Sequence, residues 1–187
     1  FMMMYIHTKY IFFITLFCCS FSLVFAQEFN TVKGIIHFRS DAPLELIKAS
    51  SNEMRGKLDA TKKAFAFTVK IRSFAGFNSP LQKEHFNENY LESNLFPDAY
   101  FSGKIIEDID FSKNGTYTVR AKGNLNIHGI TQERIIKSEI IIIGGTIRIT
   151  SAFTVQLSDH NIPVPKVVHE KLASEINVEV TADMISK

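Results

Sequence analysis

The chain has 187 residues with 21 basic and 19 acidic side chains, and it contains two cysteines and no tryptophan. A near-neutral charge without a basic cluster argues against nucleic acid as a partner and against an anionic membrane as the main one. The length is that of one ordinary domain with a single hydrophobic core.

The N-terminal residues have the pattern of a secretory signal peptide. Lys9 precedes a core of roughly 15 apolar residues, and Val24 and Ala26 occupy the third and first positions before a cleavage site. We therefore expect residues 1–26 to be removed as a Sec signal peptide, with cleavage after Ala26, and residues 27–187 to form the mature domain in the periplasm or outside the cell. A transmembrane anchor is the alternative, but it needs about 20 apolar residues.

Both cysteines, Cys18 and Cys19, lie in the apolar part of this segment. A lipid-anchored protein is disfavoured because small residues do not precede either cysteine. Cleavage after Ala26 removes both thiols, so the mature domain must be stable without disulfides. No stable membrane insertion is expected once the signal peptide is gone.

Most of the mature chain alternates apolar and polar residues with the period of two that indicates β-strands. Strands are predicted, in chain order, at 35–38, 44–49, 54–58, 65–71, 99–105, 118–127, 135–143, 147–157 and 176–181. Turn signals such as Asn114-Gly115 and Gly144-Gly145 separate several of them. The run 135–143 is more continuously apolar, which predicts a strand covered on both faces.

Two helical segments interrupt the strands. The first is predicted from about Pro80 to Phe96, because Pro97 disfavours helical geometry at the residue before it. Its apolar residues fall on one face, which suits a helix that covers an edge or an opening of the β-structure. A second short helical piece is predicted near residues 167–174.

Two short sequence motifs lie about 25 residues apart along the chain. FPDAYF at residues 96–101 follows the predicted helix, and LNIHGIT at 125–131 ends a strand in a glycine turn. The pair resembles the YceI-like family of periplasmic polyisoprenoid-binding proteins, in which a short helix, "YP-x-A-x-F" and "L-x-I-H-G-V-T" recur. The resemblance extends from about residue 34 to 184 and is strongest over 81–131. The phrase SDHNI at 158–162 departs from the family's "S-D-F-G-I", with His160 and Asn161 replacing an aromatic residue and a glycine.

The strand pattern alone is compatible with a barrel or a sandwich. The resemblance implies a lipocalin-like, all-β antiparallel barrel of about eight strands with one or two short helices. A barrel of this size is just wide enough for one slender ligand along its axis. No linker or repeat divides the chain, so residues 27–187 are expected to form one lipid-binding domain.

If the apolar faces close inward, they line an apolar lumen. The predicted lumen residues are Phe65, Phe67, Val69, Phe101, Ile105, Val119, Leu125, Ile127, Phe153, Val155 and Leu157, and the predicted residues of the mouth or lid are Leu81, His85, Phe86 and Tyr90. The alternative is that these side chains are simply packed core, each stabilising the fold by about 2 kcal/mol. Small residues on the same faces favour an open tube: Ala99, Gly103, Ala121, Gly123 and Ser151.

Polar side chains give weaker indications of chemistry. Glu84, His85 and Glu88 have helical spacing, but a solvated helix face explains them as well as a metal or proton-transfer site does. His128 is expected to be a structural turn histidine whose ring bonds nearby backbone. His160 and His169 lack a third ligand at a recognisable spacing. We expect no catalytic residue, no metal and no cofactor.

These observations predict a binding protein, not an enzyme, that carries a long isoprenoid lipid of the quinone or polyprenyl type in the lumen. A lipid-modifying enzyme that uses His85 or His128 as acid or base is one alternative. A carrier of another amphiphile, such as a fatty acid or amide, is the other, because apolar tubes discriminate methylene chains poorly. Monomer and homodimer both stay open.

Overall fold

The computed structural model describes residues 27–186, in which nine strands form one antiparallel sheet. The predicted signal peptide lies outside the described residues. The strands are β1 (Glu28–Asp41), β2 (Leu46–Ser51), β3 (Arg55–Asp59), β4 (Ala64–Lys70), β5 (Asp98–Ile105), β6 (Gly115–Ile127), β7 (Ile130–Ile143), β8 (Thr146–Gln156) and β9 (Glu175–Ser186). Short helical segments connect some of them: η1 (Ile71–Ser73), α2 (Pro80–His85), η2 (Phe86–Tyr90), η3 (Leu157–His160) and η4 (Lys166–Val168).

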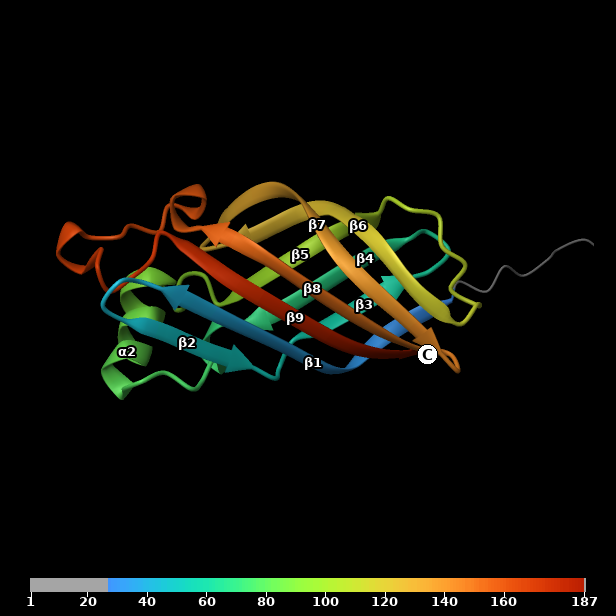
Figure 1. Cartoon of the computed structure of the whole chain (residues 1–187), viewed down its shortest axis with the longest axis horizontal. Helices are drawn as coiled ribbons and strands as arrows, with labels where there is room; N and C mark the ends of the chain where they lie inside the picture. Colours follow the sequence, from blue (N-terminus) through green and yellow to red (C-terminus); the bar gives the residue numbers. More distant parts are fainter. Residues whose placement is uncertain (1–26, 187) are drawn as a thin grey trace, which may run out of the picture.

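The sheet closes on itself because β1 is long enough to pair along both of its edges. One edge pairs with β9 from Phe29 to Arg39, and a β-bulge between Thr31 and Lys33 shifts the register. The other edge pairs with β3 near the start of β1 and with β2 near its end. Eight strands therefore form the closed barrel, and β2 is an additional strand at one end (Figure 1). The predicted antiparallel barrel is confirmed.

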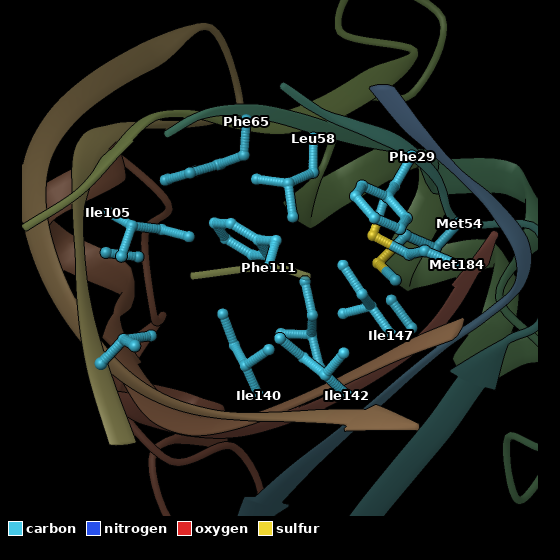
Figure 2. Close-up of a cluster of buried hydrophobic side chains, with 14 of the residues drawn as sticks. Phe29, Met54, Leu58, Phe65, Ile105, Phe111, Ile140, Ile142, Ile147 and Met184 are labelled. Atoms are coloured by element: carbon cyan, nitrogen blue, oxygen red, sulfur yellow. The ribbon is translucent and has the colours of Figure 1, made fainter. Parts of the chain in front are cut away.

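One end of the barrel is packed solid. Phe29, Leu58 and Met184 are fully buried there, and Phe111 reaches inward from the loop between β5 and β6. Figure 2 shows Phe111 between Leu58 on one side and Ile140 on the other. Burial of such side chains stabilises the fold by about 1.5–3 kcal/mol each, so this end is the hydrophobic core of the domain.

The first helical segment is shorter than the sequence predicts. Ser79 caps α2 by accepting a hydrogen bond from the Gln82 N–H, but α2 and the π-helical turn η2 end at Tyr90, well before Phe96. Glu92 adopts a left-handed conformation with φ of 43° and turns the chain. The prediction that Pro97 ends the helix was therefore wrong. Of the second predicted helical piece, near residues 167–174, the structure forms the short 3₁₀ turn η4.

Strand β7 is covered on one face only, so the prediction of burial on both faces was also wrong. Ile136, Ile140 and Ile142 point into the barrel and are buried, whereas Ile135 and Ile143 are 58% and 64% exposed. The continuous run of isoleucines reflects β-propensity on the outer face rather than a covering layer.

Gly103 of β5 and Gly123 of β6 lie opposite each other and allow a close approach of the two strands. A Cβ atom on Gly103 would lie 2.1 Å from the Lys122 carbonyl oxygen, and one on Gly123 would lie 2.3 Å from the Ser102 carbonyl oxygen. Both contacts are with backbone, which cannot move aside without opening the sheet. These glycines therefore shape the β5–β6 contact.

Gly103→Ala should lower the free energy of unfolding by more than about 2 kcal/mol, because the added methyl group pushes the two strands apart. Chemical denaturation measures this change. Lys104→Ala is the matched control, since Lys104 is the exposed neighbour on the same strand and its truncation should change stability by less than ~0.5 kcal/mol. Equal stability of Gly103→Ala and the wild type would contradict the close approach.

Candidate ligand-binding site

The barrel encloses a cavity of about 550 Å³ between the packed end and the helical end. Its innermost wall residues include Leu58, Ile140 and Ala182, and the next layer toward the packed end is filled. This volume lies within the range of small-molecule sites, about 300–1,000 Å³. The cavity is thus a closed-bottomed tube rather than a channel.

All eleven predicted lumen residues lie on the wall of this cavity. They come from β4, β5, β6 and β8 and from the start of η3, and in β4 and most of β6 the inward positions alternate with exposed ones. Their contact with a ligand stays a prediction, because wall position alone does not separate a ligand tube from a loosely packed core. Among the small residues, Ala99, Ala121 and Ser151 line the cavity, whereas Gly103 and Gly123 do not.

The four predicted mouth residues also lie on the wall, at the open end. Phe86 anchors the helical segment, since its ring stacks on Phe38 with centroids 5.3 Å apart and also contacts Phe74 and Phe77 at 5.7 and 5.1 Å. Leu81 stays 57% exposed at the rim. A π-helical turn, η2, carries Phe86 and Tyr90, and such turns are frequent at functional sites.

Sequence reasoning missed the partners of Phe86. Phe38 lies on β1, whose inward face the alternation of Ile36 and Phe38 indicates. Phe74 and Phe77 lie in the irregular segment between η1 and α2, where no periodicity marks a buried face. Aromatic pairs at these separations add about 0.5–1.5 kcal/mol each beyond their burial, so this cluster fastens the helical segment to the barrel.

A second segment, residues 166–174, forms the other side of the mouth. Figure 1 shows it at the same end of the barrel as α2 and the β1–β2 turn. The Leu44 N–H donates to the Glu170 carbonyl oxygen at 2.8 Å, and the Ala173 N–H donates to Ser40 Oγ at 2.9 Å. Gln82 Nε2 donates to Glu45 Oε1 at 2.8 Å, so the β1–β2 turn joins the two sides.

On the cavity wall, charged side chains are confined to the mouth. Over residues 27–186, the carboxylate and basic groups on the cavity wall are Glu45, His85 and Lys171, all carried by the segments at the open end. The inward-facing side chains deep in the tube are aliphatic and aromatic apart from the hydroxyls of Ser138 and Ser151. Because an unpaired charge is costly in such surroundings, the cavity selects an apolar ligand body and tolerates polar groups near the mouth.

His128 has a structural role at the outside of the mouth, as predicted. Its Nδ1 lies 3.0 Å from the His160 carbonyl oxygen and its Nε2 lies 2.6 Å from Glu92 Oε2. Its side chain is only 10% exposed, and the Phe96 ring packs edge-on against it. His128 therefore joins the β6–β7 turn to η3 and to the segment after η2.

His160 is fully buried beside His128, and its Nδ1 bonds the Ile130 carbonyl oxygen at 3.1 Å. Burial holds the pKa of His160 below its ordinary value, although the hydrogen bond to Ile130 acts in the opposite direction. The fold therefore disfavours the charged form of His160. Glu84 and His85 lie on α2 and Glu88 lies on η2, and within the described part of the chain no group of three or more His, Cys, Asp or Glu side chains is placed to hold a metal ion.

We expect acid to destabilise the protein partly through His160. The unfolded chain takes up a proton near its ordinary pKa of about 6.5, while the folded His160 resists protonation, so the free energy of unfolding falls as the pH drops below that value. His160→Phe should reduce this slope because the aromatic ring fills the site without a titratable group. Thermal melting of both proteins between about pH 7.5 and 5 tests this, and parallel curves would contradict it.

No helix in residues 27–186 has the length and apolar character required to span a bilayer.

A model of the YceI-like domain family matches residues 19–184 of the chain. A comparison with curated protein sequences found no match.

Several solved structures share the fold. A polyisoprenoid-binding domain from Saccharophagus degradans, implicated in plant cell wall breakdown, superposes with a TM-score of 0.72 at 9% identity over 85% of this chain and 98% of that one. BcnA from Burkholderia cenocepacia gives 0.65 at 14% identity over 80% and 95%. The YceI protein of Campylobacter jejuni gives 0.54 at 18% identity over 70% and 77%.

Proposed function

The chain belongs to the YceI-like family, and we propose that it binds one long, apolar isoprenoid lipid of the quinone or polyprenyl type in the lumen of its barrel. The observation that carries this proposal is the cavity of about 550 Å³, closed at one end and charged only at its mouth. A slender apolar chain fits such a tube better than a compact polar metabolite does.

The ligand class comes from the relatives. The domain from Saccharophagus degradans is described as polyisoprenoid-binding, and it covers 85% of this chain with the same barrel. An isoprenoid chain is apolar along its length, as the deep wall requires. The polar end groups of quinones and polyprenyl lipids are small enough to reach the mouth or to fit the lumen.

Burial of the lipid supplies the affinity. Each carbon that leaves water contributes about 0.8 kcal/mol, so two or three five-carbon units offset association and ordering costs of ~4–15 kcal/mol. The gain depends on the length and shape of the chain more than on individual polar contacts. We propose that the barrel carries the lipid without chemical change.

The histidines support carriage over catalysis. Both ring nitrogens of His128 have partners within the fold, the His160 carbonyl oxygen at Nδ1 and the Glu92 carboxylate at Nε2, so the ring is held in place by its own neighbours. His160 is buried and bonded to backbone. His85 lies at the rim of the cavity, without a metal cluster beside it in the described residues.

We also propose that the domain acts outside the cytoplasm, as a secreted or periplasmic protein. The signal-peptide pattern of residues 1–26 supports this location. A carrier for a lipid with almost no solubility in water has its use between two membranes or between a membrane and an enzyme.

Calorimetric titration tests the lipid class. Geranylgeraniol should bind the mature protein saturably with one ligand per barrel, and more tightly than palmitate, whose charged carboxylate is confined to the mouth. Tighter binding of palmitate would identify the protein as a fatty-acid carrier. Absence of binding by either would contradict the proposed function.

Phe67→Leu and Phe153→Leu should change ligand preference while the fold persists. Both rings are half-buried and line the cavity, so their loss widens the tube at a cost in stability of about 1 kcal/mol. The relative affinity for isoprenoids of different length should shift by several-fold in titrations. Phe96→Leu is the control, because Phe96 packs outside the cavity on His128. Reduced stability with unchanged preference in all three variants would identify Phe67 and Phe153 as ordinary core.

The helical segment α2–η2 should behave as a lid. Its amides should exchange with deuterium faster than those of β4, since over residues 80–90 no side chain is fully buried, and bound isoprenoid should slow the exchange by covering Phe86 and Tyr90. Hydrogen-exchange mass spectrometry with and without lipid measures this. Identical exchange in both states would show that the segment is fixed structure.

A further inference from the structure

Two serine hydroxyls face each other inside the otherwise apolar part of the cavity. Ser138 of β7 and Ser151 of β8 are paired across the two strands, and both lie on the cavity wall. Their Oγ atoms are 2.6 Å apart, which is a hydrogen bond. Ser138 is only 8% exposed, and Ser151 is half-buried.

The pair lies deep in the tube, away from the mouth. The next inward residues toward the packed end are Ile140 and Ile149, which pair with each other and line the bottom of the cavity. Each lies two residues from the serine on its own strand, a distance of roughly 7 Å. In the same row across the sheet, Val119 and Val180 flank the serines. The hydroxyls are thus a polar spot surrounded by aliphatic wall.

Hydrogen counting leaves one donor unused. Each serine carries one O–H, and the hydrogen bond between the two hydroxyls uses only one of these hydrogens. Within the described residues the structure gives neither hydroxyl another hydrogen bond. Because a buried donor without a partner is unfavourable, the remaining O–H is available to an acceptor in the lumen.

The surroundings restrict what that acceptor can be. The carboxylate and basic groups of the cavity wall in residues 27–186 lie at the mouth, with Lys171 the lysine among them. A phosphate or carboxylate at the serine pair would be a buried charge without a counterion, which is costly. An uncharged hydroxyl or carbonyl oxygen meets no such penalty.

We propose that Ser138 and Ser151 bind an uncharged oxygen, a hydroxyl or a carbonyl, at the leading end of the lipid. This inference rests on the proposed function and narrows the ligand to neutral, oxygen-bearing isoprenoids that enter oxygen first. Charged polyprenyl phosphates bind with the phosphate at the mouth. The tail of an oxygen-first ligand leaves across an apolar rim, where Leu44, Leu81 and Val167 are 67%, 57% and 90% exposed.

The test compares farnesol with farnesene, which lacks the hydroxyl, in the mature wild-type protein and in the S138A/S151A double variant. Removal of both hydroxyls together leaves no orphaned partner, so the fold should persist. The double variant should bind farnesol about five- to ten-fold more weakly, the loss expected of one or two neutral hydrogen bonds. Farnesene should bind both proteins equally or bind the variant more tightly.

Two further ligands identify the source of the oxygen and the role of charge. A short-chain ubiquinone offers only carbonyl and ether oxygens, whereas farnesol offers a hydroxyl. If the double variant loses more affinity for farnesol than for the quinone, hydroxyl is the preferred group. A larger loss of affinity for the quinone identifies carbonyl. Farnesyl phosphate should bind the double variant as well as it binds the wild type, because its head stays at the mouth. An equal loss for farnesyl phosphate would contradict the assignment.

Ser73→Ala is the matched control. Ser73 and Ser51 form a second hydroxyl pair, also at 2.6 Å, away from the cavity wall. The loss of the Ser73 hydroxyl should lower the melting temperature without changing the ratio of the affinities for farnesol and farnesene. If S138A/S151A behaves in the same way, the serine pair is only a strand contact and the inference is wrong. If the wild type binds none of these ligands, the proposed function itself fails.

Discussion

Closure of the sheet between β1 and β9 is the constraint on which the rest of the structure depends. Once the two strands pair from Phe29 to Arg39, every inward side chain of the barrel must either fill the interior or line a space within it. At one end Phe29, Phe111 and Met184 fill it. Farther along, smaller wall residues such as Ala99 and Ser151 leave the tube open. One closed sheet thus supplies both the core that stabilises the fold and the cavity.

The division between packed and open ends separates stability from binding. The packed end can supply most of the hydrophobic stabilisation, so the wall of the cavity can keep apolar surface available to a ligand. The open end is fastened by a different set of interactions: the rings around Phe86, the hydrogen bond from Gln82 to Glu45, and the bonds of His128. Each of these fastens a connecting segment rather than a strand of the barrel. We therefore expect the mouth to open locally while the barrel stays folded.

Local patterns predicted the barrel well because inward and outward positions alternate within each strand. The strand faces around Phe67, Leu125 and Val155 follow from period two alone. Features that depend on distant segments were missed. Glu92 turns the chain before Pro97 can end the helix, and Phe74 and Phe77 meet Phe86 from a loop without periodicity. Gly103 and Gly123 matched the pattern of wall residues, but their role depends on the neighbouring strand. The barrel rather than a sandwich came from the family resemblance, not from the alternation.

The most direct test of the central claim is native mass spectrometry of the protein expressed from the full 187-residue sequence and purified under gentle conditions, followed by extraction and identification of any bound lipid. We predict one lipid per barrel, uncharged at its leading end and drawn from a series that differs by five-carbon increments. A protein that carries straight-chain fatty acids would contradict the isoprenoid assignment. A protein that is empty after purification and stays empty when isoprenoids are added would contradict the lipid-carrier account as a whole.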